Sequence, residues 1–227
     1  MHHDLEVLED LDTVSMVAAS YVAGWARSAV AARGTFHLAV SGGRTPWAML
    51  TQLTRLDVPW DRTIVHQVDE RVAPVDDPDR NVAHLRRALG DAAAAVRPMP
   101  VEDADLERAS DRYADGLPDR FDIVHLGVGP DGHTASLVPG DPVLDVDDRL
   151  VALTAAEYEG RRRMTLTYPA LARARQLLWL VSGEDKREPL AKLLASDRSI
   201  PAGRVEAEAS LVMADREAAG GLEGVGR

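Results

Sequence analysis

The sequence contains no cysteine, and only two of its 26 basic residues are lysine, Lys186 and Lys192. The absence of cysteine excludes disulfides, thiolate catalysis, and zinc or iron–sulfur sites with cysteine ligands. No apolar run approaches the roughly 20 residues that a membrane span requires. The first residues, Met-His-His-Asp, do not resemble a secretory signal peptide, so we expect a cytoplasmic protein without a membrane partner.

The sequence also has fewer basic than acidic residues. Its 227 residues include 37 acidic and 26 basic ones, so the formal net charge is −11. A summed field of that sign repels nucleic acid and anionic membranes, so neither is expected as a partner. A small anionic substrate would therefore need a local group of basic side chains. The length and the 45% of hydrophobic residues suit one α/β domain.

Short segments rich in Val, Ile and Leu alternate with amphipathic segments along the chain. The expected strands are residues 35–40, 63–68, 122–128, 150–153, 164–167, 176–181 and 210–213. The expected helices are residues 10–33, 46–53, 81–89, 103–113, 169–173 and 185–194, with an acidic loop at 69–80. This order predicts an α/β fold: a single doubly wound, mostly parallel, Rossmann-like sheet with helices on both faces. One domain is expected over residues 1–217, followed by a frayed Gly-rich tail at 218–227.

Three of the expected strands end in polar or glycine-rich segments: residues 41–45, 69–71 and 127–133. In a doubly wound sheet, ligands bind beyond the carboxyl ends of the strands. The coincidence of three such segments at that edge predicts an enzyme active site there.

The first segment, Ser-Gly-Gly-Arg-Thr-Pro at residues 41–46, joins a strand to a helix N-terminus. Its glycines let the backbone approach a ligand, and the free amides of the helix N-terminus favour an anion. It matches neither the P-loop nor the Gly-x-Gly-x-x-Gly pattern, so it indicates a single phosphate rather than a nucleoside triphosphate. A tight turn with a helix cap explains the same residues equally well.

The third segment, Gly-Val-Gly-Pro-Asp-Gly-His at residues 127–133, makes a tight turn that places His133 at the sheet edge. Imidazole transfers protons near neutral pH, and Asp131 can orient and polarise it. The remaining central histidines are expected to be structural: His37, His66, His84 and His125. No spacing around His133 matches a metal site.

The charged residues at 69–71, 161–163 and Lys186 have two interpretations each. Asp69 and Glu70 suit acid–base chemistry and Arg71 suits a carboxylate or phosphate clamp, although a surface ion-pair cluster has the same composition. Lys186 at a helix start suits a phosphate ligand, and so does the basic run at residues 161–163. Both also suit solvated surface positions.

Together these motifs resemble those of bacterial 6-phosphogluconolactonases. The resemblance lies in residues 41–46, 69–71 with Asp79 and Asn81, 127–140, 163–167, Gly183 with Lys186, and 201–202. It implies an α/β fold related to glucosamine-6-phosphate deaminase and ribose-5-phosphate isomerase, with no metal or organic cofactor. The implied reaction is hydrolysis of 6-phospho-D-glucono-1,5-lactone to 6-phospho-D-gluconate in the oxidative pentose phosphate pathway. The expected partner is therefore a phosphorylated sugar lactone, and the expected state is a monomer or homodimer.

By the same resemblance, His133 is the general base, Asp131 orients it, and Arg71 is a charged ligand or oxyanion partner. It also implies that Gly42, Gly43, Arg44 and Thr45 hold the phosphate with Arg163 and Lys186. The full set of predicted substrate- and phosphate-binding residues is Ser41, Gly42, Gly43, Arg44, Thr45, Asp69, Glu70, Gly129, Arg163 and Lys186. The chain departs from the family at Val128, Val138 and Ala73, where bulkier or aromatic residues are common, and this affects the expected shape of the pocket.

Two alternatives stay open on the sequence. A glucosamine-6-phosphate deaminase or isomerase shares the glycine-rich loop and Asp-Gly-His, but follows the histidine with Ala-Phe-Asn-Glu-Pro. Here residues 134–139 read Thr-Ala-Ser-Leu-Val-Pro and lack that carboxylate. A non-catalytic sugar-phosphate sensor is the other alternative, against which the Asp131–His133 pair argues.

Overall fold

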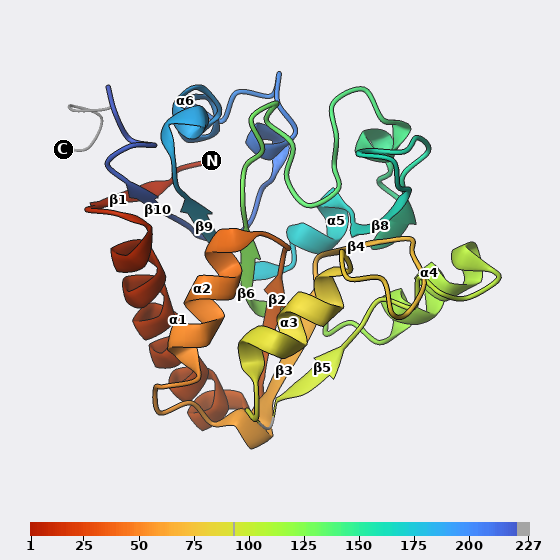
Figure 1. The fold of residues 1–227 in the computed structure, drawn as a ribbon, viewed down its shortest axis with the longest axis horizontal. Coiled ribbons are helices and arrows are strands. Elements are labelled where there is room, and N and C mark those ends of the chain that lie inside the picture. The colour runs from red at the N-terminus through yellow and green to blue at the C-terminus, as the bar shows by residue number, and fades with distance from the viewer. Residues whose placement is uncertain (93, 222–227) are drawn as a thin grey trace.

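The apolar segments form a seven-stranded sheet in which every neighbouring pair is parallel (Figure 1). This computed structural model describes residues 1–92 and 94–221. The strand order is β1-β10-β9-β6-β2-β3-β5. The strands are β1 (Asp4–Leu8), β2 (Phe36–Val40), β3 (Thr63–Gln67), β5 (Ala95–Arg97), β6 (Phe121–Leu126), β9 (Ala174–Val181) and β10 (Ser210–Asp215). The predicted doubly wound, mostly parallel α/β fold is confirmed.

Helices cover both faces of this sheet, and each face has its own hydrophobic core. One face carries α1 (Leu11–Arg33), α2 (Arg44–Leu53) and α3 (Asn81–Leu89). The other carries α4 (Leu106–Asp115), α5 (Tyr168–Leu171) and α6 (Arg187–Leu194). Short 3₁₀ turns lie at Trp60–Arg62, Pro142–Asp145, Glu184–Lys186 and Ala202–Arg204. Among the described residues, no helix has both the length and the apolarity to cross a bilayer.

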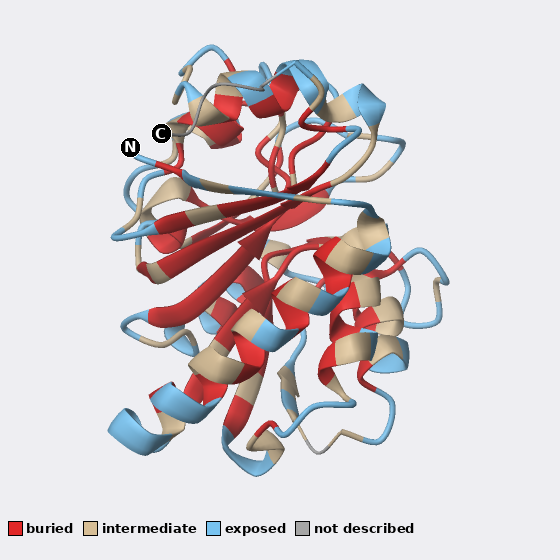
Figure 2. Cartoon of the chain, turned by 90° about the vertical axis from the view of Figure 1, so that its left-hand side faces the viewer, coloured by how far each residue is buried: buried red, intermediate tan, exposed pale blue. Residues whose placement is uncertain are grey.

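Strand β9 shows how the sheet separates the two cores. Leu177 and Trp179 point to the core with α6, whereas Leu178 and Leu180 point to the core with α1 and α2. Side chains alternate between the faces of a strand, so a strand that is covered on both faces must be apolar throughout. Figure 2 shows the consequence: the inner strands are buried, and exposed residues lie in loops, on outer helix faces and on the edge of the sheet.

A second, antiparallel sheet of three short strands lies beside the parallel one. It pairs β4 (Asp69–Arg71) with β8 (Arg163–Leu166), and β8 with β7 (Val151–Leu153). The predicted acidic loop at 69–80 therefore begins with a strand, and the expected strands at 150–153 and 164–167 belong to this sheet. Its register places Arg71 opposite Arg163, which brings two sequence-distant cations together.

The remaining differences concern the edges of the fold. The edge strands β1 and β5 were not predicted, because β1 is largely exposed and β5 has three residues. The expectation of fraying from residue 218 is wrong for Ala218 and Ala219. Both are buried, and their amides donate to the Asp215 side chain and carbonyl. Residues 222–227 of that predicted tail lie outside the described residues.

Candidate active site

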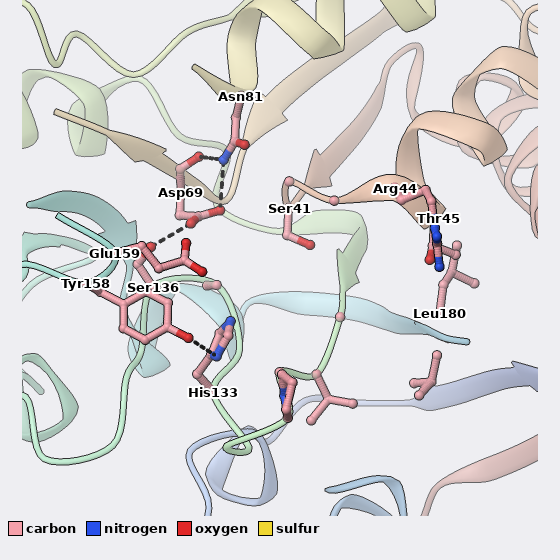
Figure 3. A pocket seen from close by; sticks show the side chains of 18 of the residues that line it. Ser41, Arg44, Thr45, Asp69, Asn81, His133, Ser136, Tyr158, Glu159 and Leu180 are labelled. Carbon is pink, nitrogen blue, oxygen red and sulfur yellow. Dashed lines mark hydrogen bonds between the residues drawn. The ribbon is translucent and has the colours of Figure 1, made fainter. Parts of the chain in front are cut away.

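A cleft of about 300 Å³ opens at the carboxyl ends of β2, β6 and β9 (Figure 3). Its walls come from the loop before α2, the start of α3, the turn after β6, and the segment leading into β8. All the predicted site residues line it except Asp131 and Glu70: Ser41, Gly42, Gly43, Arg44, Thr45, Asp69, Arg71, Gly129, His133, Arg163 and Lys186. The structure thus brings segments from distant parts of the chain into one site.

His133 lies at the wall of the cleft with Asp131 behind it. The Asp131 Oδ1 atom is 2.6 Å from His133 Nδ1, and it also accepts a hydrogen bond from the His133 amide at 3.1 Å. A Cβ atom on Gly129 would lie 2.1 Å from His133 Nδ1, so only glycine at this position leaves room for the imidazole. The glycine-rich turn therefore determines where the ring sits.

Asp131 also determines the tautomer of His133. Burial acts to raise the pKa of Asp131, but the hydrogen bonds from the His133 amide and ring and the charge of His133 lower the pKa below its usual value. An ionised carboxylate accepts hydrogen bonds only, so the imidazole proton lies on Nδ1. In the neutral imidazole with this tautomer, Nε2 carries the lone pair that accepts a hydrogen bond or a proton.

The N-terminus of α2 forms the opposite wall. Gly42 packs so tightly that a Cβ there would lie 2.2 Å from Asn81 Oδ1, and Gly43 caps the helix with φ of 137°. The cap makes no side-chain hydrogen bond to the helix amides. Arg44 and Thr45 follow in the first turn, with Arg44 exposed. Free amides and the helix dipole make this wall suitable for an anion.

Three further cations line the cleft. Arg71 Nη1 donates to the Asn81 side chain at 2.5 Å and to the Asp79 carbonyl at 2.7 Å. Arg163, with a nearly buried side chain, donates from Nη2 to the Tyr158 carbonyl at 3.0 Å, and its buried Nε has no partner in the described part of the chain. Lys186 Nζ lies 3.1 Å from Asp185 Oδ2. These cations concentrate positive charge locally in an acidic protein.

Only one residue of the basic run at 161–163 reaches the cleft. Arg161 forms an ion pair with Asp77 at 2.7 Å, and Arg162 Nε donates to the Thr154 carbonyl at 3.1 Å. Of the three, Arg163 alone lines the cleft, because alternation along the strand directs Arg162 to the other side and the ion pair with Asp77 holds Arg161.

Glu70 does not reach the cleft, contrary to its predicted place among the substrate-binding residues. Its fully buried carboxylate accepts hydrogen bonds from the Asn81 and Val82 amides at 2.8 and 2.9 Å, and from Gln67 Nε2 at 2.8 Å. A carboxylate at a helix N-terminus satisfies the free amides and the dipole. Glu70 therefore anchors α3, whereas Asp69 lines the cleft and accepts from Ser136 Oγ at 2.6 Å.

Tyr158 and Glu159 line the cleft but were not among the predicted site residues. The Tyr158 hydroxyl lies 3.4 Å from His133 Nδ1 (Figure 3), and Glu159 Oε2 lies 3.2 Å from Arg163 Nη2. No strand end or glycine-rich turn precedes them, so no local signal marks them. Over the part of the chain described, no three His, Asp or Glu side chains gather in a way that could hold a metal ion.

Comparison with known proteins reveals relatives along most of the chain. Residues 9–213 match the family model described as glucosamine-6-phosphate isomerases/6-phosphogluconolactonase. The chain is 36% identical over 201 residues to a 6-phosphogluconolactonase from Synechocystis, covering 81% of this chain and 83% of the relative. It is 34% identical to a 6-phosphogluconolactonase from Mycobacterium tuberculosis, covering 98% and 99%.

Solved structures show the same architecture. A 6-phosphogluconolactonase from Shewanella baltica superposes with a TM-score of 0.86 at 26% identity, over 94% of this chain and 98% of that one. A monomeric glucosamine-6-phosphate deaminase superposes with a TM-score of 0.82 at 21% identity, over 95% and 98%. Since both fit nearly equally well, the fold alone does not distinguish the two reactions.

Proposed function

This chain belongs to the glucosamine-6-phosphate isomerase/6-phosphogluconolactonase family, and we propose that it hydrolyses 6-phospho-D-glucono-1,5-lactone to 6-phospho-D-gluconate. One observation carries the choice of reaction. The Asp131–His133 pair presents an unprotonated Nε2 to a cleft whose other walls carry an α2 N-terminus, Arg163 and Lys186. An activated ester needs a base, a polarising cation and an anion site, and this cleft offers residues for each.

In the proposed mechanism His133 Nε2 removes a proton from a water molecule as that water attacks the lactone carbonyl. The resulting imidazolium is stabilised by Asp131, which lies 2.6 Å from Nδ1. Arg71 is the proposed partner of the oxyanion. When the tetrahedral intermediate collapses, the bond between the carbonyl carbon and the ring oxygen breaks, and the imidazolium returns its proton to that oxygen.

The phosphate is assigned to the opposite wall. The amides of Gly42 and Gly43 and the first turn of α2 face the cleft together with Arg163 and Lys186. Charge-assisted hydrogen bonds to a phosphate are stronger than neutral ones. Binding there would hold the lactone carbonyl towards His133, so that affinity and chemistry depend on different residues.

The deaminase alternative would need a further acid for ring opening. Residues 134–139 contain no carboxylate, and the side chains of Thr134 and Ser136 are buried. We therefore place deamination second. Adding the phosphorylated lactone in a pH-stat, against the spontaneous rate, should release protons. Ammonia from glucosamine 6-phosphate would instead indicate a deaminase, and saturable binding without turnover would indicate a sensor.

Three expectations belong to the same proposal. Activity should survive EDTA, because the proposed reaction uses only side chains and water. Loss of activity on chelation, with recovery when a divalent ion is added, would overturn that expectation. Sizing with light scattering should separate the monomer from the homodimer. Cell fractionation should place the activity in the cytoplasm.

A further inference from the structure

Tyr158 lies between the two halves of the proposed site. Its hydroxyl oxygen is 3.4 Å from His133 Nδ1, and its ring meets the imidazole edge-on at 62° with centroids 5.2 Å apart. On the other side, Arg163 Cζ lies 5.6 Å from the centroid of the same ring. One side chain therefore contacts both the proposed base and a proposed phosphate ligand.

A tight hairpin holds Tyr158 in this place. The backbones of Tyr158 and Arg161 exchange hydrogen bonds of 3.0 and 3.3 Å across Glu159 and Gly160, whose φ angles are 52° and 75°. Two consecutive residues with positive φ are typical of a two-residue hairpin turn. The Arg161–Asp77 ion pair and the Arg163 bond to the Tyr158 carbonyl tie this hairpin to its surroundings.

The hydroxyl acts on the same imidazole nitrogen as Asp131. Since the Nδ1 proton points to Asp131 at 2.6 Å, the Tyr158 oxygen is a second and longer acceptor for it. A phenol is neutral near pH 7 at its usual pKa of about 10, and burial and the charges of Asp131 and Glu159 raise the pKa of Tyr158 further. A second acceptor at Nδ1 favours the imidazolium and keeps Nε2 facing the cleft.

The ring acts on Arg163 in a different way. A guanidinium within about 6 Å of an aromatic centroid is attracted to the ring face. The Arg163 side chain is only 6% exposed, so water competes little with that contact. This contact favours one orientation of the guanidinium, whose buried Nε has no hydrogen-bond partner among the described residues.

We propose that Tyr158 is a positioning residue that orients the His133 imidazole through its hydroxyl and the Arg163 guanidinium through its ring. This inference rests on the proposed lactonase function and adds to it a residue that links the reacting end to the phosphate end.

Two substitutions separate the two contacts. Tyr158→Phe keeps the ring, so kcat should fall about 2- to 10-fold on both the phosphorylated lactone and glucono-lactone, with KM within about twofold of wild type. The pH midpoint of kcat/KM should fall by roughly 0.3 to 1 unit. Tyr158→Ala also removes the ring, so KM should rise about 2- to 30-fold for the phosphorylated lactone only.

The matched control is Tyr21→Phe, which removes a phenol hydroxyl from α1 outside the cleft and should match wild type. A Tyr158→Phe enzyme with wild-type kcat and pH midpoint would overturn the proposal. An equal rise of KM on both lactones for Tyr158→Ala would overturn it too.

An NMR titration of His133 in wild type and Tyr158→Phe tests the hydroxyl contact without any turnover and without the alanine variant. The His133 pKa should be lower in Tyr158→Phe, and equal values would overturn the proposal. If wild type does not hydrolyse the lactone, the proposed function fails, and this titration still decides whether Tyr158 acts on His133.

Discussion

His125 and His133 are eight residues apart on the same strand and its following turn, yet their surroundings differ completely. His125 is fully buried in β6, where Nδ1 lies 3.3 Å from Ser41 Oγ and Nε2 has no partner within residues 1–92 and 94–221. Burial alone lowers the pKa of His125 to about 3. His133 lies at the cleft wall with its side chain 23% exposed and a carboxylate on Nδ1. The same residue type is thus held neutral in one place and set beside a carboxylate at the cleft wall in the other.

The other buried histidines resemble His125. His66 stacks on His37 with centroids 5.4 Å apart and meets Phe121 edge-on at 5.5 Å. Burial, followed by the charges of His37 and Arg97, lowers the pKa of His66 to about 3. A histidine with no carboxylate and little water is a poor proton carrier at neutral pH. The comparison assigns chemistry to His133 by surroundings rather than by residue type.

Removing the cleft histidine should have the largest effect. In His133→Ala, kcat should fall by roughly 10²–10⁴-fold, while the affinity for 6-phosphogluconate changes little, because the base acts on water and not on the phosphate. Steady-state kinetics and calorimetric binding measure the two quantities. A variant that retains most of its turnover would show that another group activates the water.

The buried histidines should instead control stability in acid. Their pKa values in the folded state, about 3 for His66 and His125 and about 4 for His3, lie below the ordinary 6.5. Below pH 6.5 these histidines therefore bind protons in the unfolded chain but not in the folded chain. The free energy of unfolding consequently falls as the pH drops. By pH 5 each fully buried histidine should lower the free energy of unfolding by about 2 kcal/mol.

Denaturant unfolding between pH 6.5 and 5, above the range where most carboxylates titrate, measures this loss. His125→Asn should flatten the pH dependence, whereas substitution of the exposed His2 should leave the slope unchanged. A free energy of unfolding that stays constant from pH 6.5 to 5 would contradict the assignment.

Much of the site was predictable, because its main signals are local. The loop at 41–45 and the turn at 127–133 each follow a buried strand directly, so the general topology of a parallel sheet is enough to bring them together. The long helix α1 and the inner strands were likewise predictable from apolar spacing.

The rest depends on contacts between distant segments. Tyr158 and Glu159 reach the cleft only because β8 pairs with β4. The paired residues Arg71 and Arg163 are 92 positions apart in the sequence. Glu70 turns away because the amides it caps belong to α3, eleven and twelve residues further on. Neither the β4–β8 pairing nor the contact of Glu70 with α3 produces a pattern within a short window of sequence. The charged triplet at 69–71 therefore does not show which of its carboxylates faces the cleft.

At the phosphate wall the expected effects are smaller and fall on KM. A hydrogen bond to a charged group contributes about 1.5–3 kcal/mol. Lys186→Ala should therefore raise KM for the phosphorylated lactone by roughly 10- to 100-fold, with kcat changed less. Glucono-lactone, which has no phosphate, should be hydrolysed about equally by wild type and variant. Equal impairment on both lactones would mean that Lys186 is structural or catalytic.

The smallest expected effect concerns the carboxylate that faces Arg163. Glu159 Oε2 lies 3.2 Å from Arg163 Nη2, and the Glu159 side chain is 67% exposed. Because of this exposure, the ion pair contributes at most about 1 kcal/mol to the free energy of folding. A substrate phosphate that binds Arg163 must displace or repel that carboxylate.

Glu159→Gln keeps a hydrogen-bonding group and removes the charge. It should lower KM for the phosphorylated lactone by about 2- to 5-fold and leave glucono-lactone unaffected. The difference from wild type should shrink as salt is added, because an exposed charge is screened. The matched control is Glu157→Gln. Glu157 is exposed and lies outside the cleft, so this substitution removes the same charge two positions earlier. If both variants lower KM equally, the effect comes from net charge, and the contact with Arg163 does not tune phosphate binding.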